Sequence, residues 1–281
     1  MKARSLWSHL RTLAALVGVV VAGGAAAEDL KSPEAAAATS PAGFSVTEAQ
    51  FLVGRLKNPF VPGTEAWTPI VTIQHASSWS FGDVFFFVDI LDDRKKDGFN
   101  DADAYGEFYA YFSSNKMFGA QYGGALKDIG AVAGVNYGAD SDFRVYLPGV
   151  YADWNVPGFA LFRTQLTGFI DDSKDTIGKA GSSKDGWQAT LVWSLPFEIG
   201  GQYFSFEGFA EYTGLSYNKT YNAKRKDWIL IEPQLRWDAG YAFTGVKNKF
   251  FLGTEYHYFR NKLGVDGVNE SRFQALAVVR F

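Results

Sequence analysis

The chain has 281 residues, a formal net charge of −3 and no cysteine. The lack of cysteine excludes disulfides, thiolate catalysis and cysteine-bound metals, and the acidic balance argues against a nucleic-acid-binding protein. Aromatic side chains make up 17% of the residues, and Phe leads them with 25.

The first 27 residues have the layout of an export signal. The basic head MKARSLWSHLR is followed by the apolar run TLAALVGVVVAGG. Small residues at Ala25 and Ala27 then predict cleavage before Glu28, which leaves a net charge of −6. The alternative is a retained anchor, but the apolar run is short for a spanning helix.

Residues 28–45 are rich in Ala, Ser and Pro, and we expect a flexible tail there. From residue 46 onward, apolar and polar residues alternate in short runs, which is the pattern of β-strands. Each run has roughly the 9–11 residues that a tilted strand needs to cross a bilayer. About twelve strands are predicted, near 46–57, 68–77, 83–91, 104–113, 128–137, 143–153, 159–170, 187–196, 202–213, 227–239, 249–260 and 271–281.

Two of these strands are weaker than the rest. The first, 46–57, alternates poorly and is closed by prolines, so its place in the sheet is open. The sixth carries Pro148 near its middle, where a missing N–H interrupts a ladder.

The two faces of the predicted strands differ sharply. In 227–239, one face carries Ile229 and Ile231, and the other carries Glu232, Gln234 and Arg236. Such charge does not suit the dry core of a soluble sandwich, but it suits a wet interior. The sequence therefore predicts an all-β fold, a transmembrane antiparallel barrel over residues 46–281, with apolar faces toward lipid.

The connections alternate in length, as they do in bacterial barrels. NKLGVDGVNE and DDSKDTIGKAGSSKDG fall on one side, and NVPG and SWSFG fall on the other. Residues 138–142 and the segment SNKMFGAQYGGALK break this pattern. An even strand count places both ends in the periplasm, and strand 271–281 must close against the first, because lipid tolerates no open edge.

Parity also predicts the interior. The run GDVFFFVDI turns Phe85, Phe87 and Asp89 inward, and the polar faces hold charges of both signs, which predicts opposed acidic and basic walls. The inward rings either form stacking stations for flat solutes or simply fill a narrow barrel. Interface girdles are expected to contain Trp67, Trp187, Trp193, Trp228, Trp237, Tyr256 and Tyr258.

The run IVTIQHASSWSFGDVFFFVDI, the acidic loop after it, EFYAYF and the closing strand with Phe281 resemble one known family. The chain is similar to the nucleoside-specific channel-forming proteins of outer membranes, the Tsx and OmpK type, most specifically over residues 70–112. The resemblance implies a monomeric twelve-stranded barrel, passive nucleoside passage, and outer loops that phages and colicins use as receptors. It also implies that Phe281 is a sorting signal for the barrel assembly machinery.

We therefore predict an outer-membrane channel of a Gram-negative bacterium for passive, selective diffusion of nucleosides. The alternatives are a structural barrel that acts as a receptor through surface loops such as 174–184, or a general small-solute pore. Lipid and lipopolysaccharide are expected partners, and no catalytic residue, metal, cofactor or nucleic-acid polymer is predicted. The expected lumen contacts are Phe85, Phe87, Asp89, Glu107, Tyr109, Arg163, Phe209, Glu232 and Arg236.

Two further motifs give weaker hypotheses. His75 lies two residues from Ser77, as in a barrel lipase, but no orienting third group is evident. Asp101 and Asp103 echo a calcium loop, but Tyr105 stands where an oxygen ligand is needed, so a solvated acidic loop is the simpler interpretation.

Overall fold

The computed structural model describes residues 43–139, 143–173, 183–214, 217–218, 223–224 and 226–281. The predicted signal peptide, residues 28–42 of the predicted tail, and most of loop 174–184 lie outside the described residues. The barrel begins at Ser45, one residue before its predicted start.

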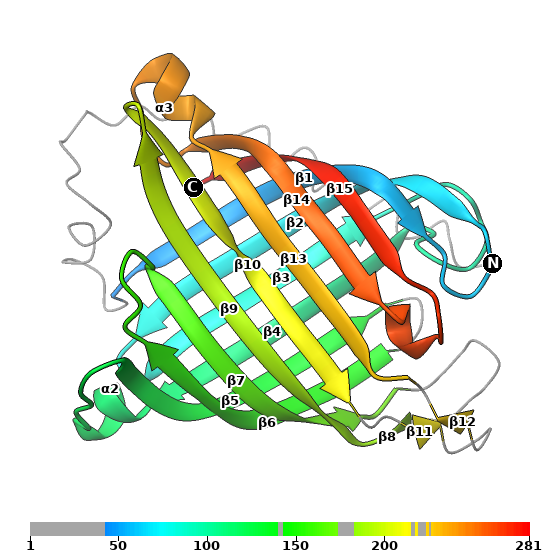
Figure 1. Cartoon of the computed structure of the whole chain (residues 1–281), viewed down its shortest axis with the longest axis horizontal. Coiled ribbons are helices and arrows are strands. Elements are labelled where there is room, and N and C mark those ends of the chain that lie inside the picture. Colours follow the sequence, from blue (N-terminus) through cyan, green and yellow to red (C-terminus); the bar gives the residue numbers. More distant parts are fainter. Residues whose placement is uncertain (1–42, 140–142, 174–182, 215–216, 219–222, 225) are drawn as a thin grey trace. The chain divides into compact units, whose positions relative to one another are not determined.

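Twelve strands form a closed antiparallel barrel (Figure 1), so the predicted fold class and strand number are confirmed. Each strand end lies within three residues of its predicted position. The barrel strands are β1 Ser45–Lys57, β2 Glu65–Trp79, β3 Gly82–Leu91, β4 Asp103–Ser113, β5 Leu126–Gly138, β6 Phe143–Trp154, β7 Leu161–Asp171, β9 Gly186–Ile199, β10 Gln202–Gly214, β13 Trp228–Trp237, β14 Phe250–Arg260 and β15 Glu270–Arg280.

The short elements lie in the connections. We call the end at which β15 finishes the helix end, because it carries the two helices, and we call the opposite end the loop end (Figure 1). No helix among the described residues is long and apolar enough to span a membrane. These elements are α2 Ser114–Phe118, α3 Ala239–Thr244, the 3₁₀ turn η2 Lys262–Gly264, and a small sheet of β8 Ser183–Lys184, β11 Tyr217–Asn218 and β12 Ala223–Lys224.

The first strand closes the barrel as the last strand requires. β1 pairs with β2 along its whole length and with β15 from Glu48 opposite Arg280 to Val53 opposite Ala275. The Phe281 N–H also donates to the Thr47 carbonyl at 2.9 Å. This ladder confirms that the last strand pairs with the first, and it leaves neither edge open.

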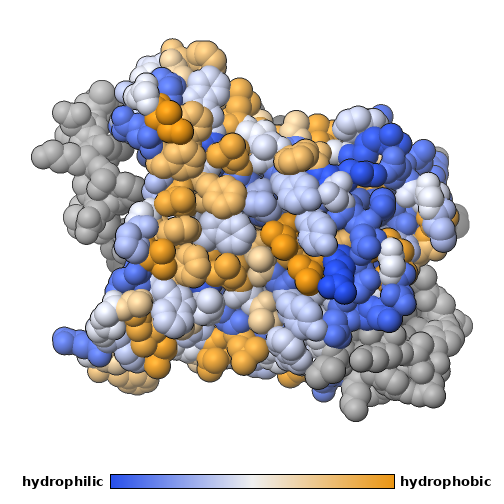
Figure 2. All heavy atoms as spheres, viewed as in Figure 1, coloured by the Kyte–Doolittle hydropathy of each residue, from blue (hydrophilic) through white to orange (hydrophobic). Residues whose placement is uncertain are grey.

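The outward positions of the wall are mostly apolar. Figure 2 shows hydrophobic side chains over the barrel wall and hydrophilic ones gathered toward the loop end. A soluble monomer rarely exposes so much apolar surface, whereas a membrane barrel requires it. Exposed outward side chains include Phe51, Trp67, Phe108, Val150, Leu166, Leu235 and Phe273.

Two predicted girdle residues are buried, Trp193 on the outward face of β9 and Trp228 on the inward face of β13. Trp228 is buried and packs edge-on against Phe169, with ring centroids 5.6 Å apart. Trp228 is buried because the even-numbered residues of β13 point inward, and Trp228 lies on the same face as Glu232. Its indole therefore fills the interior near the loop end.

Candidate functional site inside the barrel

All nine predicted lumen residues lie at inward positions. The ladder places Phe87 opposite Glu107, and Phe85 opposite Tyr109, on β3 and β4. It places Phe209 opposite Glu232 on β10 and β13. Arg163 on β7 and Arg236 on β13 complete the inward set.

The interior is unevenly filled. Inward side chains are mostly buried on β5–β7, and also on β14, β15 and β1. They are mostly half-buried around β3 and around β10, which lie six strands apart in the ring of twelve and are therefore opposite each other. The solvent-accessible inner surface thus consists of two facing walls, which we call the β3 wall and the β10 wall.

The β3 wall carries an aromatic line. Phe85 and Phe87 have ring centroids 6.2 Å apart, and Phe87 and Tyr105 follow at 6.1 Å. Phe143 extends the line at 6.3 Å from Tyr105. These rings are half-buried and present π surface to the interior, as parity predicted for the two phenylalanines.

Carboxylates lie beside these rings. Glu107 accepts hydrogen bonds from the Tyr105 hydroxyl at 2.6 Å, the Tyr109 hydroxyl at 2.9 Å and the Asn136 amide at 2.9 Å. Asp89 accepts from the Thr72 hydroxyl at 2.5 Å. Both carboxyl groups are held by neutral donors.

The Arg163 side chain is buried and binds carboxylates on two other strands. Its guanidinium donates to Asp153 at 2.6 and 2.8 Å and to Asp83 on β3 at 2.8 Å. It also lies 4.0 Å from the Tyr111 ring centroid and 4.5 Å from that of Tyr151. These contacts neutralise the cation and close off the β4–β6 side of the interior.

Arg236 occupies a similar position on the other side. Its side chain is 2% exposed and contacts Glu48 at 3.0 Å and Glu207 at 3.1 Å. Arg280 also binds Glu48, at 2.5 Å. The expected basic wall is therefore absent from the described part of the chain, because these arginines are buried against carboxylates.

Sequence reasoning did not select three residues that now belong to the site. Tyr105 lies on the β3 wall, and Glu207 and Glu211 lie on the β10 wall, all half-buried. Parity could have marked Tyr105 as inward, and it did place both glutamates inward. Counting around the predicted ring of twelve strands would also have placed 202–213, the ninth strand, opposite the third strand with Phe85.

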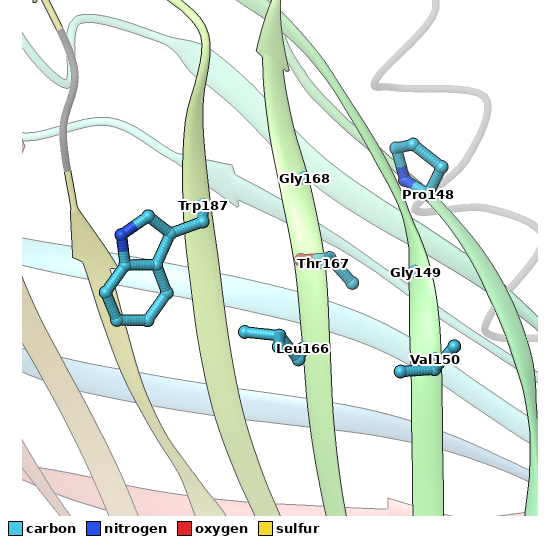
Figure 3. Close-up of a pocket in the computed structure, with 7 residues that line it drawn as sticks. All are labelled: Pro148, Gly149, Val150, Leu166, Thr167, Gly168 and Trp187. Carbon is cyan, nitrogen blue, oxygen red and sulfur yellow. The ribbon is translucent and has the colours of Figure 1, made fainter.

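A depression on the outside of the barrel is separate from this site. It has a volume of about 550 Å³ and lies where Pro148 interrupts the pairing of β6 with β7. Figure 3 shows Leu166 and Trp187 on the neighbouring strands β7 and β9. Its outward side chains belong to the apolar wall, so it faces the surroundings of the barrel.

The weak hypotheses from sequence find no support in the geometry. His75 points outward, where its ring contacts the Thr47 hydroxyl at 2.8 Å and stacks on Phe86. Asp101 accepts hydrogen bonds from the backbone N–H groups of Lys96 and Gly98, both at 2.7 Å, so it is occupied in holding its loop.

Comparison with known proteins finds no matching family model and no matching curated protein. The chain is similar to the solved KdgM porin, with 9% identity and a TM-score of 0.47, over 84% of this chain and 99% of that one. It is also similar to the high-pH structure of Pseudomonas putida OprB, with 9% identity and a TM-score of 0.27, over 85% and 94%. At this low sequence identity and structural overlap, the function of this chain has to be inferred from the side chains inside its own barrel.

Proposed function

We propose that this chain is an outer-membrane channel for passive diffusion of small solutes that carry an aromatic ring, with nucleosides as the substrate class. The observation that supports this is the half-buried line of Phe85, Phe87 and Tyr105 beside Asp89 and Glu107. The apolar outer wall supports the location in a membrane.

Passage would proceed by weak stacking and exchange. Stacking of a base on an aromatic side chain contributes roughly 1–3 kcal/mol, which is enough to select a flat ring and weak enough to release it. Carboxylates at Asp89 and Glu107 accept hydrogen bonds from sugar hydroxyls or exocyclic amines. Flux then follows the concentration gradient, and no energy source is needed.

Charge would refine the selection. Asp89 and Glu107 on one wall face Glu211 and Glu232 on the other, and rings of acidic side chains favour cations over anions. A nucleoside is neutral, whereas a nucleotide carries a phosphate that these walls repel. We therefore propose that the channel passes nucleosides in preference to nucleotides.

The double change Phe85→Ala plus Phe87→Ala is expected to weaken nucleoside block of the channel. Loss of two stacking stations at roughly 1–3 kcal/mol each corresponds to at least a tenfold rise in the blocking concentration. The measurement is single-channel conductance in a planar bilayer with adenosine, thymidine and glucose titrated in turn. The matched control, Phe108→Ala plus Phe112→Ala, removes two outward rings that are exposed on the wall.

Unchanged block by nucleosides in the double variant would remove the stacking proposal. Equal indifference of the natural channel to nucleosides and glucose would instead indicate a general pore. Absence of conductance would favour the receptor alternative.

Neutralising the walls is expected to lower the preference for cations. The triple change Asp89→Asn, Glu107→Gln and Glu211→Gln removes three acidic groups from the two walls, so the potassium-to-chloride permeability ratio should fall several-fold. The reversal potential in a potassium chloride gradient measures this ratio. Glu198→Gln, at an exposed position at the helix end, is the control. A ratio that stays the same in the triple variant would show that these carboxylates do not line the ion path.

A further inference from the structure

The connection from Asn261 to Asn269 turns into the loop end of the barrel. It contains η2, in which the Lys262 side chain is buried and only 4% exposed. Leu263 packs against the interior cluster that contains Trp228 and Phe259. This loop therefore places both a cation and an apolar side chain inside the entrance.

Lys262 is fixed by short contacts to the wall. Its ammonium donates to Glu270 at 2.5 Å and to the Lys57 carbonyl at 3.0 Å. Glu270 is fully buried and also accepts the Lys57 N–H at 2.5 Å. The contact of Lys262 with Glu270 thus fastens the loop to β15, and we call it the latch.

A histidine joins the latch to the proposed passage. His257 Nε2 lies 3.2 Å from Glu270, and His257 Nδ1 contacts the carboxylate of Glu232. Glu232 is half-buried on the β10 wall, opposite Phe209 in the ladder. Two carboxylates therefore flank one imidazole, which hydrogen-bonds to Glu232 of the passage and lies near Glu270, the residue that holds the loop.

The backbone of the loop is strained. Asn261 has φ of 49° and Leu263 has φ of 53°, both in the left-handed region. Holding a non-Gly residue in this conformation costs free energy, so the conformation persists only where surrounding contacts fix it. Such strained residues are often found in segments that switch between conformations. Asn tolerates this conformation better than Leu does, so Leu263 is the residue that most needs the latch and its packing.

Other loops meet this one at the same end. The Lys262 ammonium lies 5.2 Å from the centroid of the Phe99 ring, and Phe99 packs on Phe60 at 5.8 Å. Within the described residues, side chains from three connections thus converge above the entrance to the interior.

We propose that the loop Asn261–Asn269 is a lid, that Lys262 on Glu270 latches it closed, and that His257 is a positioning residue that couples the latch to Glu232. A solute that hydrogen-bonds to Glu232 competes with His257 for that carboxylate. His257 then turns to Glu270, which competes with Lys262 and loosens the lid. The coupling between Glu232 and the lid rests on the proposed function, whereas the lid itself does not.

The lid is tested in potassium chloride alone. Lys262→Met should raise the ratio of open to closed time at least about tenfold, because it removes one partner of a buried ion pair. Lys262→Arg should restore closure. The control, Lys226→Met, breaks an exposed pair with Asp266 of the same loop, 3.3 Å long, and should change little.

A second variant and a second readout keep the test decisive. Leu263→Asn tolerates the left-handed backbone but lacks the apolar contact, so it should also open the lid.

The natural chain has no cysteine, so Val192→Cys on the inward face of β9 gives a single thiol. Its reaction with a charged thiol reagent added from the loop side should accelerate with Lys262→Met. Unchanged open times and unchanged thiol reactivity in both lid variants would overturn the lid.

The coupling is tested by adding adenosine. In the natural channel, adenosine should raise the open fraction, and His257→Leu should abolish this rise. His257→Gln, which offers two N–H donors for the two carboxylates, should restore it in part. A rise that persists in His257→Leu overturns the coupling. If adenosine neither blocks nor shifts the natural channel, the coupling falls together with the proposed function, and the potassium chloride results still decide the lid.

Discussion

Replacement of Arg163 by Met is expected to lower the free energy of unfolding of the barrel by about 3–5 kcal/mol. The side chain is 5% exposed and binds Asp153 through two hydrogen bonds and Asp83 through a third. Met fills a similar volume but leaves the buried Asp153 carboxylate without its cation, whereas Asp83 keeps its ion pair with Lys116 at 2.9 Å. The uncompensated Asp153 carboxylate then lies where water screens its charge poorly.

Urea unfolding in lipid vesicles measures this loss. The control is Arg55→Met, which breaks a pair with Glu65 whose side chains are 50% and 26% exposed. Such an exposed pair contributes about 0–1 kcal/mol, so the two variants should differ clearly. The double variant Arg163→Met, Asp153→Asn should recover part of the stability, because it removes the stranded Asp153 charge. Equal losses for Arg163→Met and Arg55→Met would contradict a structural role for the buried network.

The strands could be predicted because lipid and the interior impose opposite requirements on their two faces. Alternation then persists through most of the strands, and an error of one residue would invert a whole face. The first strand alternates poorly because its inward face includes Leu52 and Leu56, which are buried in the filled side of the barrel. Its membership becomes evident only from its pairing with β2 and β15.

The direction of each site residue was predictable, but its neighbours were not. Arg163 meets Asp83 across 80 positions of sequence, and Arg236 meets Glu48 across 188. Parity states that these side chains point inward and says nothing about which strands face one another. The prediction of a basic wall was wrong for that reason, since Arg163 and Arg236 each bind a carboxylate from a strand far away in the sequence as well as one from a neighbouring strand.

The helical connections show a different limit of prediction from the sequence. α3 and η2 are too short for periodicity to mark them, and the interior position of Leu263 depends on a left-handed backbone that the sequence does not signal. The lid proposal could therefore arise only from the structure. The aromatic line had a sequence signal, because GDVFFFVDI places two rings on one face.

Gly208→Ala is expected to disrupt the β10 wall and to destabilise the whole barrel. Gly208 has φ of 149°, and an added Cβ would lie 2.2 Å from the Glu232 carbonyl oxygen on β13. The strained backbone alone costs about 1–3 kcal/mol, and the clash with backbone atoms adds to it. Because Glu207 and Phe209 flank this position, a shift of β10 should also weaken nucleoside block.

Gly168→Ala is the matched control for this prediction. Its added Cβ would lie no closer than 3.7 Å to any neighbouring heavy atom, at the Pro148 carbonyl oxygen. Where the backbone accepts a side chain, Gly→Ala stabilises by about 0.4–1 kcal/mol through the unfolded state. Heat-modifiable gel migration and urea unfolding should therefore show loss for Gly208→Ala and none for Gly168→Ala. Similar behaviour of the two variants would mean that β10 and β13 are not as closely paired at Pro233 as the structure has them, and the position of the β10 wall would have to be revised.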